Sequence, residues 1–307
     1  MAITLDEAAK LSNDILLQGV VETIIKDSPL LQGMPFIEIV GNALTYNRES
    51  TLPSAEWHAV NDDWVTSPVI DFSKQTATLA ILGQNADVDN YIKQTRSNVQ
   101  DIESAVIELT AKAIRHELEE TFIYGNSTTS PNQFDGLIEI INTDAASDQV
   151  IAMGATGATL TLTKVDELID AIKGGKPDLL MMSRRSRRKL NALARAAGNN
   201  LEVGTGKLGE FVQLYNGIPV AINDFILNTH TLVNSLETIY TGAANSTIYA
   251  FQFGEDGLCG LTGPGGLQVQ PIGPMEGKDA DRTRVKWYVS LALFSNIKAA
   301  ALIGVQD

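Results

Sequence analysis

Residues 97–125 read SNVQDIESAVIELTAKAIRHELEETFIYG, which is the longest helical pattern in the sequence. Ser97 or Asn98 can cap this helix, acidic residues occupy its first turns, and Gly125 can end it. The predicted apolar stripe consists of Val99, Ile102, Val106, Leu109, Ala113, Leu118 and Phe122. At a rise of about 1.5 Å per residue the helix is about 40 Å long, more than most small domains are wide. We therefore predict a spine helix against which other elements pack.

An extended arm is predicted on the N-terminal side of this helix. LTYNRE at 44–49 and KQTATLAIL at 74–82 both alternate between polar and apolar residues, which indicates two strands joined by a polar tip. The arm carries Trp57, Trp64 and Phe72. An isolated two-stranded ribbon is marginally stable in water, so another surface must cover it. The arm either folds back on its own domain or lies across another copy, where these aromatic side chains would anchor an interface.

Strands return in the C-terminal part of the chain. In RVKWYVSLAL, residues 284–293, every second residue from Val285 to Leu293 is apolar, and GLQVQP at 266–271 alternates in the same way. One face of the resulting ribbon is expected to be buried, and the spine helix is its natural partner. The predicted fold class is therefore α+β, with a helix-on-sheet body.

The middle of the chain follows a different pattern. TKVDELIDAIKGG at 163–175 is typical of a capped helix, and PDLLMMS at 177–183 and GIPVAIND at 217–224 are typical of short buried strands. Helices and strands alternate here, whereas the flanking parts hold one long helix and long ribbons. We expect this block, about 143–263, to form its own lobe.

A basic helix is predicted inside this lobe, from SRRSRRKLNALARAAG at 183–198. Ser183 can cap it, Leu190 and Leu193 mark its buried side, and Gly198 can end it. The opposite, wet side carries Arg184, Arg185, Arg187, Arg188 and Lys189. We interpret these arginines as a surface that faces another subunit or solvent, in preference to a DNA grip.

The composition supports that preference. The chain has 307 residues, 44% of them hydrophobic, with 37 acidic against 23 basic residues and a net charge of -14. Such a chain can bury a sizeable core, and its average surface repels nucleic acid and anionic membranes. The N-terminus lacks a basic start followed by a continuous apolar run, so neither a signal peptide nor a membrane span is predicted.

Motifs that carry chemistry are scarce. GTGKLG at 204–209 matches G-x-G-x-x-G, but a dinucleotide site needs a helix after it, and EFVQLYNGIPVAIN reads as a strand. NDDW at 61–64 and DVDN at 87–90 lack the twelve-residue calcium loop and are interpreted as solvated turns. A nucleotide-binding enzyme remains only a distant alternative.

The residue types that most often catalyse or bind metals are few. His58, His116 and His230 are far apart in sequence, and none has a neighbour at metal-ligand spacing. The only cysteine, Cys259, cannot form an internal disulfide and is interpreted as a small buried filler, as suits a reducing cytosol or a fold held by packing. We predict no catalytic residue, no metal site and no cofactor.

The order of these elements resembles that of tailed-bacteriophage major capsid proteins, whose fold is named after the Hong Kong 97 phage. A helix capped by Thr4 and Glu7 comes first, then the arm, the spine helix ending in YGN, the FDGLIEII turn, the inserted lobe and the terminal strands. The resemblance covers nearly the whole chain and rests on order rather than on an invariant motif. It implies an N-terminal arm at 1–43, an extended loop at 44–84, a peripheral domain at 85–142 and 264–307, and an axial domain at 143–263.

The resemblance implies a structural function. Many copies would assemble as pentamers and hexamers into an icosahedral shell that encloses double-stranded DNA, which the shell contacts weakly and without specificity. The implied partners are a separate scaffolding protein and a portal protein, with a decoration protein left open. Assembly would take place in the host cytoplasm, the product would be a virion, and no membrane is involved. An encapsulin-type protein compartment uses the same fold and stays open as an alternative.

Some relatives cross-link a lysine of the extended loop to an asparagine on the terminal strand. Lys74 is the only lysine between residues 44 and 84, and the matching strand reads VKWYVSL, without an asparagine. Asn296 falls beyond that strand. We therefore expect no covalent cross-link.

Overall fold

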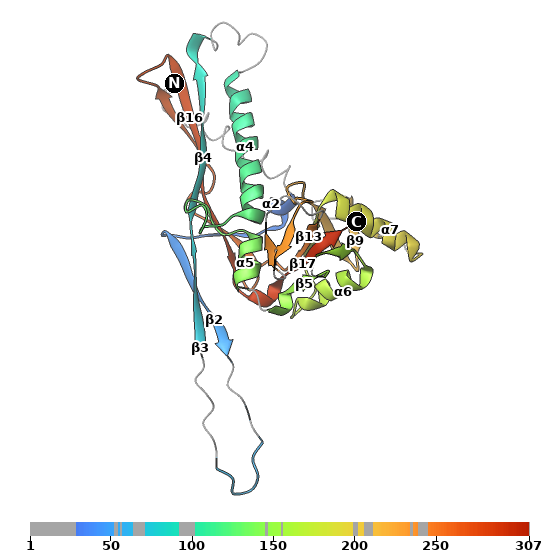
Figure 1. The fold of residues 1–307 in the computed structure, drawn as a ribbon. Helices are drawn as coiled ribbons and strands as arrows, with labels where there is room; N and C mark the ends of the chain where they lie inside the picture. Colours follow the sequence, from blue (N-terminus) through green and yellow to red (C-terminus); the bar gives the residue numbers. More distant parts are fainter. Residues whose placement is uncertain are drawn as a thin grey trace.

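A computed structural model gives the fold and describes residues 29–51, 55, 57–63, 71–91, 102–144, 147–154, 156–198, 202–205, 211–233, 236–238 and 245–306. Figure 1 shows an elongated ribbon, a long helix beside it, a projecting arm and a rounded lobe. The predicted helix at Thr4 lies outside the described residues, as does Trp64. None of the helices within the described ranges is both long and apolar enough to span a bilayer.

A five-stranded sheet forms the elongated ribbon. Its strands are β1 (Phe36–Glu38), β4 (Ala80–Asp89), β14 (Leu258–Thr262), β15 (Gln268–Pro274) and β16 (Ala280–Leu293). The long strand β16 pairs antiparallel with β4 along one edge and with β15 and β14 along the other, and β1 extends the sheet parallel to β14. The antiparallel pair of β15 and β16 confirms the terminal ribbon predicted from alternation.

Strand β4 corrects two predictions. Residues 74–82 were expected to form one strand, but the chain leaves the arm at Leu79 and then enters β4 of the larger sheet. The DVDN segment is not a solvated turn, because Asp87 and Asp89 lie in β4. The Asp87 carboxylate accepts from Arg282 Nε and Nη2 of β16, each at 2.7 Å, and this hydrogen-bonded ion pair lowers the pKa of Asp87.

The spine helix α4 (Ile102–Tyr124) packs against β4 and β16, as predicted. Its buried face consists of Ile107, Ala111, Ile114, Leu118 and Phe122, in one cluster with Val285, Trp287, Val289 and Leu291 of β16. The predicted stripe was wrong at two positions. Leu109 is 65% exposed and Ala113 is also exposed, because the sheet covers the neighbouring stripe of the helix.

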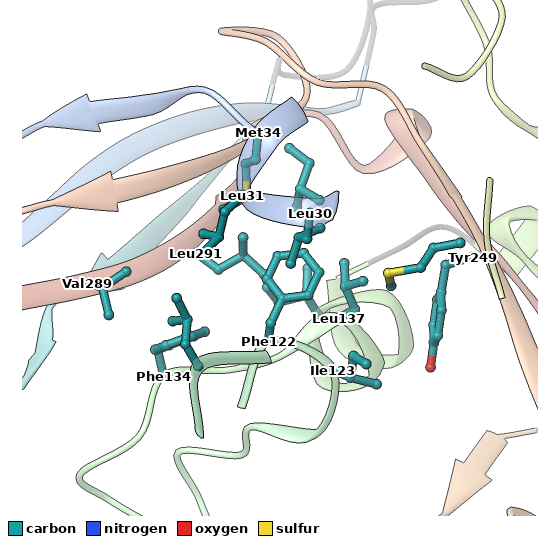
Figure 2. Packing of buried hydrophobic residues seen from close by; sticks show 14 of the residues in the cluster. Leu30, Leu31, Met34, Phe122, Ile123, Phe134, Leu137, Tyr249, Val289 and Leu291 are labelled. Carbon is teal, nitrogen blue, oxygen red and sulfur yellow. The ribbon is translucent and has the colours of Figure 1, made fainter. Parts of the chain in front are cut away.

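The end of α4 packs against two short helices. Figure 2 shows Phe122 and Ile123 beside Leu137 of α5 (Leu137–Asp144) and Leu30 of α2 (Pro29–Gly33). These four side chains belong to the largest core cluster, which also reaches Tyr249 in the lobe. The FDGLIEII segment was predicted as a turn leading into an apolar run, and that run forms α5. One continuous core therefore joins the ribbon to the lobe.

The lobe is built on an eight-stranded mixed sheet in the order β5, β17, β13, β7, β10, β9, β8, with β6 also on β17. The strands are β5 (Val150–Ala152), β6 (Ala158–Thr159), β7 (Leu179–Met182), β8 (Glu202–Thr205), β9 (Phe211–Tyr215), β10 (Ile218–Ile222), β13 (Ser246–Phe251) and β17 (Ala299–Gln306). Helices α6 (Leu162–Ala171) and α7 (Arg184–Ala196) bury their apolar faces against this sheet in one cluster. The remaining short elements are β11 (Thr231–Val233), β12 (Leu236–Thr238), η1 (Ser147–Gln149) and η2 (Asn296–Lys298).

The two large sheets exchange strands across the predicted boundary at residue 263. Strand β14 precedes it in sequence but lies in the five-stranded sheet, and β17 follows it but lies in the eight-stranded sheet of the lobe, between β5 and β13. The last strand therefore belongs with the middle block rather than with β16. A single cut at residue 263 does not separate the two sheets.

Candidate assembly surfaces

The arm is a long antiparallel ribbon of β2 (Ala43–Thr51) and β3 (Asp71–Thr78), as predicted. It projects away from the lobe in Figure 1. Side chains alternate between the two faces along both strands. The half-buried residues of one face are Leu44, Tyr46, Arg48, Ser73, Gln75 and Ala77. On the opposite face, the residues from Ala43 to Glu49 and from Phe72 to Thr78 are exposed. The body of the protein therefore covers only one face of the arm, and only at its base.

A clamp of side chains fixes the base of the arm. Tyr46 Oη donates to the carbonyl oxygen of Leu293 at 2.9 Å, and Arg48 Nε donates to that of Phe294 at 3.0 Å. Arg48 Nη2 also donates to the Leu293 oxygen, and the rings of Tyr46 and Phe294 meet edge to face with centroids 4.9 Å apart. Sequence reasoning missed this clamp. Its only signal is that Tyr46 and Arg48 share the apolar face of Leu44.

The far part of the arm exposes large apolar side chains. Trp57 is 103% exposed, Val60 is 94% exposed and Phe72 is 59% exposed. An indole without any cover is unusual, because tryptophan is highly buried on average. Within the described part of the arm, the chain does not fold back on its own domain. Trp57 and Phe72 are thus available to a second molecule, while Trp64 lies outside the described residues.

A second exposed surface lies on the side of the ribbon opposite α4. Ile81 of β4 is 76% exposed, whereas Trp287, its neighbour on the buried face, is 9% exposed. A shallow hollow beside Ile81 is lined by Gly83, Gln84, Asn85, Arg284, Lys286 and Tyr288. The surface thus combines aliphatic and aromatic carbon with two cations. The exposed apolar side chain of Ile81 makes this surface a candidate for contact with another molecule.

The basic helix α7 forms as predicted. Ser183 Oγ accepts from Ser186 N at 3.3 Å as the N-cap, and Leu190 is buried. The exposure of the basic side chains is less uniform than expected. Arg184 and Arg188 are exposed, but Arg185 and Arg187 are half-buried. Arg184 forms a bidentate ion pair with Asp224 of the same chain, which lowers the pKa of Asp224 through the hydrogen bonds and the charge of the guanidinium. At Arg184, therefore, an acidic partner is already present within the chain.

The GTGKLG segment falls between two paired strands. Gly204 and Thr205 belong to β8, which pairs antiparallel with β9, while residues 206–209 lie outside the described part. A dinucleotide site needs a helix N-terminus at this point, to which the pyrophosphate binds. The element that follows is instead the strand β9, so the geometry required for the nucleotide reading is missing.

The remaining chemical candidates have structural environments. Cys259 is fully buried, which raises the pKa of its thiol and keeps it in the unreactive form. His230 is also fully buried, and its Nε2 lies 2.7 Å from Tyr124 Oη at the end of α4. The Tyr124 hydroxyl also accepts from Leu227 N at 2.7 Å, so this side chain ties the end of α4 to the lobe. Across the described ranges, no three potential metal ligands come together.

Comparisons with known proteins agree on one architecture. A model described as "Phage capsid family" matches residues 11–254. No curated protein matches the chain in sequence.

Solved structures that are similar in fold include the holo-SrpI encapsulin complex from Synechococcus elongatus, with a TM-score of 0.69, 18% identity and coverage of 91% of this chain and 88% of that one. The capsid of an empty GTA particle matches with a TM-score of 0.63, 16% identity and coverage of 90% and 89%. A structure of Mycobacterium phage Bobi matches with a TM-score of 0.62, 15% identity and coverage of 91% of each chain. These likenesses confirm the predicted fold.

Proposed function

This chain belongs to the phage capsid family, whose members are shell-forming structural proteins, and from that premise we propose that its shell encloses double-stranded phage DNA. Copies assemble as pentamers and hexamers into an icosahedral shell in the host cytoplasm, and the shell becomes part of the virion. A separate scaffolding protein guides assembly and a portal protein occupies one vertex, while the presence of a decoration protein stays open. The division into N-terminal arm, extended loop, peripheral domain and axial domain belongs to the same proposal.

The observation that carries the proposal is the uncovered arm. A ribbon with Trp57 and Phe72 exposed gains little from its own body, so its stability has to come from another molecule. We propose that the arm of one copy lies over the exposed side of the ribbon around Ile81 in the next copy. A standard interface buries about 1,600 Å² in total, and a subunit with several such contacts gives a durable shell from modest pairwise affinities.

The charge balance supports a container rather than a DNA-binding protein. A chain with net charge -14 binds polyanions weakly, which lets DNA move past the wall during packaging and release. At physiological salt, charges more than about 8 Å apart are largely screened, so subunits of like charge can still assemble.

Electron microscopy of the expressed protein tests this function. We expect closed particles of uniform size when the chain is produced together with the proteins encoded beside it. Particles that hold DNA protected from nuclease support the capsid role. A protein that remains monomeric at high concentration under the same conditions contradicts the proposal.

An encapsulin-type compartment is the second candidate, favoured by the fold match to the encapsulin from Synechococcus elongatus over 91% of this chain. The contents of the particle separate the two functions. Particles that form without a scaffolding protein and retain a co-produced protein as cargo favour the compartment.

We expect that no covalent cross-links join the subunits of the shell. Lys74 lies opposite Asn47 in the arm and is exposed, and the matching strand offers no asparagine. Boiling in detergent and reductant should therefore release a single band at the mass of the monomer. Lys74→Arg, which keeps the charge and removes the reactive amine, should give the same band and the same particle yield. A ladder from the unmodified chain that disappears in Lys74→Arg contradicts this prediction.

A further inference from the structure

Two neighbouring helices of the lobe carry opposite charge. The sequence of α6 contains three acidic residues and one lysine, whereas that of α7 contains six basic residues and no acidic one. Both helices bury apolar side chains in the same cluster, so their polar faces point outward on the same side of the eight-stranded sheet. The lobe therefore presents an acidic surface and a basic surface in one chain.

The basic surface consists of Arg184, Arg188 and Arg195, which are all exposed. Spacings of four and seven residues place them in one stripe along α7, where like charges repel one another. The first turn of α7 contains no acidic residue, and cations at a helix N-terminus also oppose the macrodipole. Among the described residues, Asp224 forms an ion pair with the first arginine of the stripe. Arg195 lies in the last turn, where a cation is favoured by the macrodipole, but the helix itself does not offset the repulsion within the stripe, so the pattern fits an external anionic partner.

The acidic surface consists of Glu167 and Asp170, both exposed on α6. Asp166, on the same helix, accepts instead from Tyr215 Oη at 2.8 Å and is engaged within the chain. The Nζ atom of Lys164 lies 2.6 Å from Oε2 of Glu167, so this ion pair partly compensates the negative charge of Glu167. Helix α6 packs against β5, β17 and α7, whereas α7 follows β7 and leads to β8, the strand at the far edge of the sheet.

We propose that the acidic surface of one copy binds the basic surface of the next copy around a ring. The proposal rests on the proposed assembly into rings and names the contact that holds adjacent lobes together. A contact between two different surfaces is head-to-tail, and repetition of such a contact closes into a ring or continues as a filament. Charge complementarity also fixes the register and disfavours pairing of equal surfaces.

Charge reversal at either surface tests the contact. Glu167→Arg with Asp170→Arg makes both surfaces basic, and Arg188→Glu with Arg195→Glu makes both acidic. We expect each double variant to fold, as judged by circular dichroism of dispersed subunits, and to reduce particle yield about tenfold or more, because every ring contact becomes repulsive. Glu117→Arg with Glu120→Arg on α4 changes the net charge by the same amount as the first double variant, so it is the matched control for that variant and should assemble normally.

A mixture of the two double variants provides the decisive test. In a 1:1 mixture an all-basic copy can alternate with an all-acidic copy, so every contact is attractive again. Alternation closes only in rings with an even number of subunits. We therefore expect the mixture to form hexameric rings, sheets or tubes but no closed icosahedral particles, which need five-membered rings.

Three results overturn the contact. The first is normal particle yield from either double variant alone. The second is a loss of DNA binding by the acidic variant without any loss of assembly. The third is a mixture that stays dispersed although both variants are folded. Failure of the unmodified chain to form particles contradicts the proposed function instead, so the two failures are distinguishable.

Discussion

A chain in which residues 52–70 are replaced by an Asn-Gly turn is expected to fold but not to form shells. The turn would join Thr51 to Asp71, the residues that end β2 and begin β3, and two-residue Asn-Gly turns suit antiparallel strands. The clamp at Tyr46 and Arg48 stays in place, and only the base of the arm contacts the body. The melting temperature of the subunit should therefore change by no more than a few degrees.

The loss of assembly follows from the exposed aromatic residues of the arm. Removal of one hot-spot aromatic side chain costs about 2 kcal/mol or more per contact, which is about a thirtyfold loss of affinity. Every copy carries an arm, so the loss recurs at each contact of the shell. Sedimentation and negative-stain microscopy should find dispersed subunits and no particles.

Single substitutions in the arm provide graded controls. Trp57→Ala should reduce particle yield strongly, and Asp63→Ala, at another exposed position of the tip, should leave it unchanged. Particles of normal size and yield from the chain without residues 52–70 would show that the arm does not hold the shell together.

Much of the fold could be predicted because local periodicity survives in the tertiary structure. Alternation in RVKWYVSLAL predicted the long strand β16, since from Arg284 to Tyr288 one side is buried and the other is exposed or half-buried, whereas both sides are buried from Val289 onward. Ser183 predicted the start of α7, because a cap acts within a single helical turn. In both cases the information lies within a few residues of the element itself.

Elements without a periodic pattern were placed less well. Strand β17 is buried on both faces from Ala299 to Val305, so its sequence does not reveal which sheet it joins. The predicted buried stripe of α4 wrongly included Leu109, because two adjacent stripes of this helix contain apolar residues. Only contact with the sheet determines that the stripe with Ile107 and Ile114 is buried. Such choices depend on residues that are distant in sequence.

The assembly surfaces also combine features that the local sequence predicts with features that depend on distant residues. Trp57 and Phe72 were predicted as candidate interface residues because they are aromatic residues within a polar arm, and both are exposed. The clamp at the base of the arm was missed because its acceptors are backbone oxygens of Leu293 and Phe294, about 245 residues further along the chain. The sequence of Arg48 and its neighbours contains no information about those carbonyl groups.

The second large effect is expected from a single methyl group at Gly125. This residue follows the last turn of α4, where the chain from Phe134 to Gly136 passes directly beside it, and Gly136 N donates to its carbonyl oxygen at 2.8 Å. A Cβ on Gly125 would overlap the Phe134 carbonyl oxygen and lie 2.5 Å from that of Thr121. Both obstacles are backbone atoms, which cannot rotate away as a side chain can. The two segments would have to separate, although Phe134 and the adjacent Leu137 are part of the main core.

Gly125→Ala should therefore destabilise the subunit by about 3 kcal/mol, the upper end for overpacking, and lower its melting temperature by about 6 °C or more. Gly277→Ala is the matched control, because a Cβ at that turn position meets no atom within 4 Å. The control should melt within about 1 °C of the unmodified chain, since surface changes usually stay within about 0.5 kcal/mol. Equal melting temperatures for the two variants would show that the contact between the end of α4 and the start of α5 can widen without cost. A drop confined to Gly125→Ala instead identifies this crossing as the point where the spine helix is fixed to the rest of the core.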